Sequence, residues 1–201
     1  PTLRIAIVGA KEERGVADKI IAELTQEYSV TINNFCGEFS LQETFNLISR
    51  SKYVLCHDSM AGHMGAITGT KVITISKGNV RPAETGPYGV GNLNICMRKK
   101  TLNYDPYNKN AVERELRPKT IAQIISCYIA RGTTLDSLRQ NLLKNVSVFE
   151  LSDLQVLYSS LTNEQQLHYS DVTQTVTLDE IYRVFYRLIF NIHLSDYNER
   201  I

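Results

Sequence analysis

The sequence has no tryptophan, and only four of its 201 residues are cysteines. These cysteines (Cys36, Cys56, Cys96 and Cys127) lie far apart and form no Cys-x-x-Cys pair, a pattern that argues against a disulfide framework or a zinc site. We therefore expect reduced thiols that pack in the interior, and no bound metal. No apolar run reaches the roughly 18 residues of a membrane-spanning helix, and the chain does not open with a signal peptide. These absences predict a cytoplasmic protein.

The sequence also lacks an excess of charge of one sign, since its formal net charge is +1. A balanced charge gives no reason to expect a nucleic-acid partner. The basic excess lies in residues 1–132, whereas residues 133–201 are net acidic. With 43% hydrophobic and 21% charged residues, the composition is that of a folded globular protein.

Short apolar runs alternate with amphipathic stretches through the first part of the chain. The runs predict strands, and the stretches between them have helical spacing; one of these helices starts at a capping box made by Ser40 and Glu43. The predicted strands cover 4–9, 29–33, 53–56, 72–75 and 93–97. Strands that alternate with helices in this way indicate an α/β fold with a Rossmann-like parallel sheet.

The remainder of the chain has helical spacing. After a long polar loop at 98–119, helices are predicted over 120–131, 135–143 and 151–161, and a capping box at Thr177 and Glu180 starts one more. The apolar stripe of that last helix could lie on a membrane surface, or it could face the core or a dimer contact. We therefore predict two domains, a Rossmann-like domain at 1–132 and a helical extension at 133–201.

Ligands of open parallel sheets bind beyond the carboxyl ends of the strands. The segment after the third strand is the richest in polar groups, because Asp58 and Ser59 precede a short helix that carries His63 in its first turn. Helix N–H groups and the Ser59 hydroxyl could bind a diphosphate there, or Asp58 or Ser59 could simply cap the helix. Nearby cations for the phosphates would be Lys11, Lys77 or Arg81.

Several familiar catalytic motifs are missing. The chain contains no Asp-x-Asp pair, no Gly-x-Gly-x-x-Gly fingerprint, no P-loop and no Gly-x-Ser-x-Gly elbow. NAD enzymes, P-loop nucleotidases and serine hydrolases are therefore disfavoured. A bound diphosphate would have to be neutralised by amides and cations without carboxylate-held Mg²⁺.

An ordered set of short motifs resembles glycosyltransferase family 9, the ADP-heptose:lipopolysaccharide heptosyltransferases, in the carboxyl-terminal half of those enzymes. The set comprises Val8-Gly9-Ala10 with Glu12-Glu13, Gly37 with Ser40-Leu41-x-Glu43, Asp58-Ser59 with His63 and Ala66, Gly69, and Gly86-Pro87-Tyr88-Gly89. The resemblance implies a nucleotide-sugar-binding domain of the GT-B architecture, which transfers a sugar with inversion to a glycan or glycolipid of the bacterial surface. It implies no metal or other cofactor, and a site in the cytoplasm or at the inner membrane face.

The resemblance also implies the site residues. Asp58, Ser59, Met60 and His63 would line the nucleotide and diphosphate, Phe39 would pack against the base, Glu13 would lie at the nucleotide, and Lys77 with Gly78 would form the loop beside the donor phosphates. Members of the family usually have glycine where this chain has Met60, whose side chain would hinder close approach of a ligand to the backbone.

The resemblance leaves part of an enzyme unaccounted for. The first residue is Pro1 rather than Met, and the acceptor domain with its general base, together with the first strand and helix of the donor domain, would precede it. We therefore expect a donor half whose catalytic base lies elsewhere. The alternatives are a non-catalytic, transferase-like scaffold that uses the extension to contact a partner, and a sugar-nucleotide epimerase.

Overall fold

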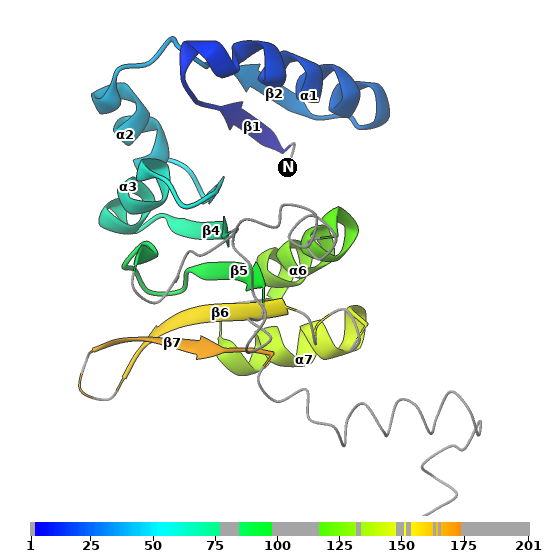
Figure 1. Cartoon of the computed structure of the whole chain (residues 1–201), viewed down its shortest axis with the longest axis vertical. Coiled ribbons are helices and arrows are strands. Elements are labelled where there is room, and N and C mark those ends of the chain that lie inside the picture. Colours follow the sequence, from blue (N-terminus) through cyan, green and yellow to red (C-terminus); the bar gives the residue numbers. More distant parts are fainter. Residues whose placement is uncertain are drawn as a thin grey trace, which may run out of the picture. The chain divides into compact units, whose positions relative to one another are not determined.

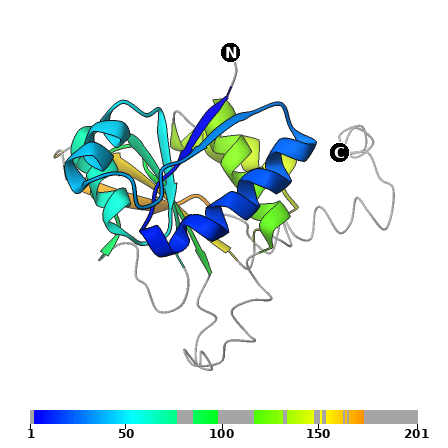
Figure 2. The same cartoon turned by 90° about the horizontal axis from the view of Figure 1, so that it is seen from above.

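The computed structural model describes residues 3–76, 85–97, 117–131, 134–147, 151, 154–162, 164 and 166–173. The predicted loop at 98–119, apart from its last residues, and the predicted helix after Thr177 lie outside these ranges. Contacts group the chain into two compact units, Pro1–Ser51 (unit 1) and Lys52–Ile201 (unit 2). Figure 1 and Figure 2 show the elements of each.

Unit 1 is built on two parallel strands, β1 (Arg4–Ile7) and β2 (Thr31–Asn34). The short 3-10 helix η1 (Lys11–Glu13) and α1 (Arg14–Glu27) connect them, and α2 (Leu41–Ser49) follows. The predicted capping box at the start of α2 is confirmed. The Glu43 amide donates to Ser40 Oγ (3.3 Å), and the Ser40 amide donates to Glu43 Oε2 (2.8 Å). Hydrogen bonds from the Ser40 hydroxyl and amide lower the pKa of the Glu43 carboxyl, because they favour its charged form.

Unit 2 contains a five-stranded sheet in the order β3-β4-β5-β6-β7. The strands β3 (Tyr53–Cys56), β4 (Lys71–Ser76) and β5 (Leu93–Met97) are parallel, whereas β6 (Leu154–Leu161) and β7 (Leu167–Asp171) join them antiparallel. Among its described residues, this unit has the helices α3 (Met60–Thr68), α6 (Pro118–Arg131) and α7 (Leu135–Asn145). The α/β, Rossmann-like class that the sequence predicts is confirmed, with the predicted strands distributed over two hydrogen-bonded sheets.

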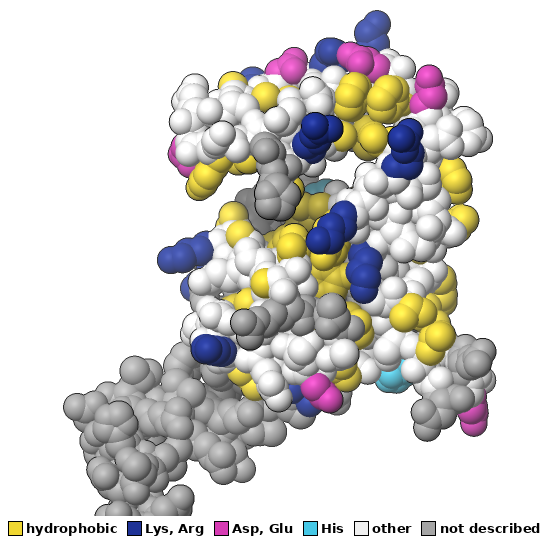
Figure 3. All heavy atoms as spheres, turned by 180° about the vertical axis from the view of Figure 1, so that it is seen from behind, with side chains coloured by type: hydrophobic (Ala, Val, Ile, Leu, Met, Phe, Trp, Pro, Cys, Tyr) yellow, Lys and Arg dark blue, Asp and Glu magenta, His cyan; other side chains and the backbone are white. Residues whose placement is uncertain are grey.

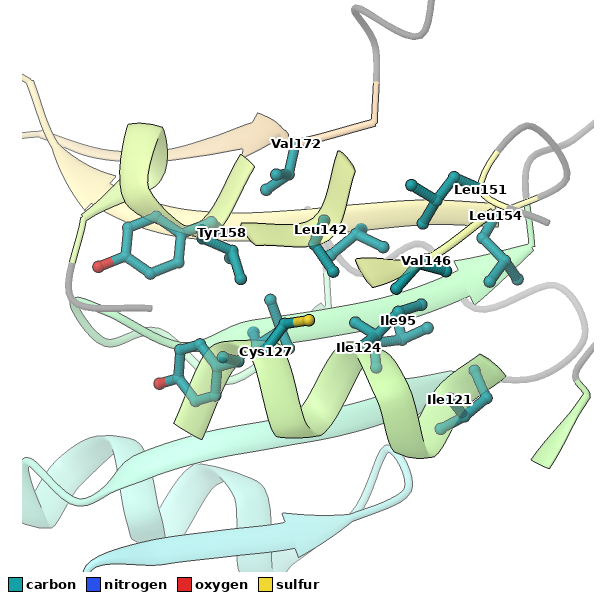
Figure 4. Packing of buried hydrophobic residues seen from close by; sticks show 14 of the residues in the cluster. Ile95, Ile121, Ile124, Cys127, Leu142, Val146, Leu151, Leu154, Tyr158 and Val172 are labelled. Atoms are coloured by element: carbon teal, nitrogen blue, oxygen red, sulfur yellow. The ribbon is translucent and has the colours of Figure 1, made fainter. Parts of the chain in front are cut away.

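One face of the larger sheet carries the core of unit 2. Alternate residues of β4, β5 and β6 point toward α6 and α7, where Ile124, Leu138 and Leu142 are buried (Figure 4). On the other face, the small residues of α3 pack against β3 and β4. At Gly65 an added Cβ would lie 2.7 Å from Val72 Cγ2, so glycine allows this helix to approach β4 closely.

The prediction of a helix over 151–161 is wrong, because Leu154–Leu161 is strand β6. Its apolar residues occur at spacings of two, three and four, which suit either a helix or a strand buried on both faces. Leu154, Val156 and Tyr158 join the core, and Leu157 and Ser159 on the opposite face are also buried. Segment 133–201 is therefore helical only in part: the helix predicted at 135–143 is confirmed as α7, and β6 and β7 extend the sheet.

A buried polar network fixes the loop that runs from Thr85 into β5. The Asn92 side chain, 3% exposed, accepts from the Val72 amide (3.0 Å) and donates to the Pro87 carbonyl (3.2 Å). Its backbone amide donates to Ser159 Oγ (2.8 Å), and its carbonyl accepts from the Ser159 amide (3.0 Å). Asn92 thus joins β4, the loop and β6.

Replacing Asn92 should be costly, because Asn92→Ala would leave the Val72 amide and the Pro87 carbonyl buried without these partners. We expect the free energy of unfolding to fall by about 2–3 kcal/mol, measured by urea denaturation. The exposed Asn145 provides the control, and Asn145→Ala should change the stability by no more than about 0.5 kcal/mol. Equal, small effects of both substitutions would contradict the role given to the network.

Candidate functional site

The loops after β1 and β2 are held together at the carboxyl ends of these strands. The Phe35 amide donates to the Ile7 carbonyl (2.8 Å), and the Gly37 amide donates to the Gly9 carbonyl (2.9 Å). Gly37 has a φ of 74°, and a Cβ there would lie 2.7 Å from the Lys11 Cα. Both the backbone conformation and the close contact therefore favour glycine at this turn.

Glu13, predicted at the nucleotide, turns back onto this loop. Its Oε2 accepts a hydrogen bond from the Ala10 amide (2.7 Å), and a Cβ at Gly9 would lie 2.5 Å from the same oxygen. The carboxylate therefore caps the turn that contains it, and the residue as a whole is exposed.

Phe39, predicted to pack against the base, stacks on Phe35 with ring centroids 4.6 Å apart and an interplanar angle of 19°. Both rings are half-buried, so the pair presents part of its aromatic surface to solvent. Between them in the sequence, Glu38 accepts from Arg14 (2.7 Å), whose other nitrogen donates to the Cys36 carbonyl (2.9 Å). The bond to Glu38 raises the pKa of Arg14, and the two contacts tie α1 to the loop that carries Phe39.

In unit 2 the predicted site residues Asp58, Ser59, Met60 and His63 are all exposed, at the end of β3 and the first turn of α3. Ser59 occupies the N-cap position, yet its side chain accepts no hydrogen bond from the helix. Its hydroxyl lies beside the Cys56 thiol, where it opposes the rise in pKa that burial gives this cysteine. Since a thiol is a weak partner, the hydroxyl can turn to a stronger acceptor such as a phosphate oxygen.

Two neighbouring side chains hold the segment around Asp58. Thr85 Oγ1 donates to Asp58 Oδ2 (3.3 Å), a contact that the sequence did not indicate. The ring Nδ1 of His57 lies 2.8 Å from the Ile75 carbonyl oxygen, which joins the end of β3 to β4. The Thr85 hydroxyl therefore holds the Asp58 carboxylate beside the loop that follows Thr85.

Two buried polar atoms lie on neighbouring inner strands of the sheet, on the face that α3 packs against. They are Thr74 Oγ1 on β4 and Asn94 Oδ1 on β5, which are register partners and are at most 3% exposed. The amide nitrogen of Asn94 donates to Ser76 Oγ (3.0 Å). The sheet below α3 therefore carries buried polar side chains as well as apolar ones.

The loop from Gly86 to Gly91 packs along α3. A Cβ at Gly62 would lie 3.7 Å from Pro87 Cγ, and one at Gly89 would lie 3.3 Å from Ala66 Cβ. Sequence motifs indicated this loop, but they gave no sign of its partners Ser159 on β6 and Tyr169 on β7. The hydroxyls of these residues donate to the carbonyls of Gly89 and Pro87. Lys77, Gly78 and Arg81 lie outside the described residues, and Lys11 is exposed in η1.

Comparison with known proteins identifies the family. A model of glycosyltransferase family 9 (heptosyltransferase) matches residues 2–112. The chain belongs to glycosyltransferase family 9. The match spans the loops after β1, β2, β3 and β4 and ends before α6, so β6 and β7 lie outside it. Searches of curated proteins and of solved structures found no match.

The described residues contain no group of three or more His, Cys, Asp or Glu side chains arranged to hold a metal ion. None of the described helices is long and apolar enough to cross a membrane. On the face drawn in Figure 3, the Lys and Arg side chains of the described residues are scattered, some beside Asp or Glu side chains and others beside hydrophobic surface.

Proposed function

We propose that this family 9 glycosyltransferase chain binds a nucleotide-diphosphate sugar, ADP-heptose or a related compound, as the donor of a heptosyltransferase-like reaction. The supporting observation is the exposed first turn of α3, where the Ser59 hydroxyl does not cap the helix, within the range of the family match. A diphosphate at this turn would meet the positive end of the helix dipole, the Ser59 hydroxyl and the His63 ring.

The proposed roles of the other residues follow their chemistry. Asp58, held by Thr85, would fix the path of the loop. The Phe35–Phe39 stack offers an aromatic surface to a base, and Glu13, next to Gly9, offers a carboxylate to the nucleotide. Lys11, together with Lys77 beside Gly78, would neutralise phosphate charge, so that the leaving group needs no divalent cation.

In the proposed reaction, a hydroxyl of a glycan or glycolipid acceptor attacks the anomeric carbon on the face opposite the diphosphate. The carbon–oxygen bond to the diphosphate breaks, a general base takes the hydroxyl proton, and the configuration inverts. The chain contributes stabilisation of the leaving diphosphate, and we assign no general base among the described residues. We place this reaction in bacterial surface-glycan or lipopolysaccharide synthesis, in the cytoplasm or at the inner membrane face.

Calorimetric titration of the whole chain with ADP, UDP and GDP tests the donor site. At least one nucleotide should bind, and Ser59→Ala should weaken its binding by about 1–3 kcal/mol, because a hydroxyl that donates to a charged phosphate is lost. Ser126 on α6 is also exposed, so Ser126→Ala is the matched control and should leave the affinity unchanged. Absence of binding of all three nucleotides at millimolar concentration would contradict the proposal.

Met60 supports a second candidate, a transferase-like scaffold without donor binding. It stands where the family usually has glycine, at the first position of α3, and its side chain is 55% exposed at the proposed diphosphate site. Removal of 133–201 cannot test this candidate, because residues of that segment, Leu142 and Val156 among them, form part of the core.

Substitution of Met60 separates the two candidates. If the chain binds a donor and the Met60 side chain only restricts its approach, Met60→Gly should tighten nucleotide binding in the same titration. Ile67→Gly places a glycine in the last turn of the same helix and controls for loss of helix stability. A scaffold would bind no nucleotide with either residue at position 60.

A further inference from the structure

The loop from Thr85 to Asn92 is anchored by two strands that lie outside the family match. Ser159 on β6 donates from its hydroxyl to the Gly89 carbonyl (2.5 Å) and accepts from the Asn92 amide (2.8 Å). Its carbonyl accepts from the Gly91 amide (2.8 Å), and its amide donates to the Asn92 carbonyl (3.0 Å). Tyr169 on β7 donates from its hydroxyl to the Pro87 carbonyl (2.8 Å). The β6–β7 hairpin thus holds the loop through side chains and backbone alike.

The same loop contacts the proposed donor site from its other side. Thr85 donates to Asp58, and Pro87 and Gly89 lie against Gly62 and Ala66 of α3, as described above. Contacts therefore connect β6 and β7 to the loop, and connect the loop to Asp58 and to α3. The first turn of α3 is where the diphosphate is proposed to bind.

We infer that Ser159 and Tyr169 are positioning residues for the donor site, acting through the loop on Asp58 and on α3. The inference rests on the proposed function for its ligand, a nucleoside diphosphate. Their hydrogen bonds go to the carbonyls of Gly89 and Pro87 in the loop. Both are well placed to set the loop, since Ser159 is fully buried and Tyr169 is half-buried.

The sequence offers a reporter for the loop that does not depend on a ligand. The chain contains no tryptophan, and Tyr88 at the middle of the loop is 61% exposed, so Tyr88→Trp introduces a single indole fluorophore. The emission maximum of this indole and its quenching by iodide report on the position of the loop.

The experiment combines Ser159→Ala or Tyr169→Phe with Tyr88→Trp and measures indole fluorescence, thermal unfolding and ADP, UDP and GDP affinity. We expect a changed indole signal and a roughly 2- to 10-fold loss of affinity, as for loss of a net hydrogen bond. The controls are Ser160→Ala, which alters the next residue of β6, and Tyr53→Phe, which removes a hydroxyl from β3. Both should leave the fluorescence and the affinity unchanged, whatever small change they make in the unfolding temperature.

The outcomes separate the two proposals. An unchanged indole signal in both variants overturns the anchoring of the loop, and a changed signal with unchanged affinity overturns its link to the donor site. The inference is also overturned if a control variant with the same fall in unfolding temperature loses as much nucleotide affinity as Ser159→Ala or Tyr169→Phe. If the parent protein binds no nucleotide, the proposed function fails and the positioning role fails with it, whereas the indole signal still shows whether the hairpin anchors the loop.

Discussion

A single buried carboxamide joins the parts of unit 2 that the sequence keeps far apart. Asn92 binds the Val72 amide of β4, the Pro87 carbonyl of the loop and, through its backbone, Ser159 of β6. Every one of these groups is removed from water, so each must have its partner inside the protein. The Tyr128 hydroxyl adds a bond from α6 to the Gly91 carbonyl. The loop beside α3 is consequently joined to the sheet by hydrogen bonds.

This arrangement explains how a family 9 segment is completed by residues beyond the family match. Because β3, β4 and β5 are parallel, Asp58, which follows β3, lies at the edge of the sheet where β4 and β5 also end. The antiparallel strand β6 then pairs with β5, which would otherwise be an edge, and β7 pairs with β6. Both added strands supply side chains that hold the loop. Scaffold and candidate site are therefore connected by hydrogen bonds, and the acidic segment 133–201 takes part in both.

The sequence predicted the elements whose signals are local. The apolar run Tyr53–Cys56 is strand β3, and Ser40 and Glu43 form the predicted capping box. Asp58 and Ser59 lie between β3 and α3, as the sequence predicted. The prediction from sequence was wrong at β6. A strand buried on both faces lacks the alternation of apolar and polar residues by which a strand is distinguished from a helix. The prediction also missed the partners of the site, since the bond from Ser159 to Gly89 joins residues 70 positions apart. The roles of all the predicted site residues toward a ligand stay predictions: Glu13, Phe39, Asp58, Ser59, Met60, His63, Lys77 and Gly78.

Residue-resolved hydrogen exchange of the whole chain tests most directly whether the loop is part of the sheet. The account predicts that the amides of Gly91 and Asn92, which donate to Ser159, exchange as slowly as the amide of Val72, which donates to Asn92. Exchange of Gly91 and Asn92 at the rate of an open surface loop, with Val72 still protected, would contradict it.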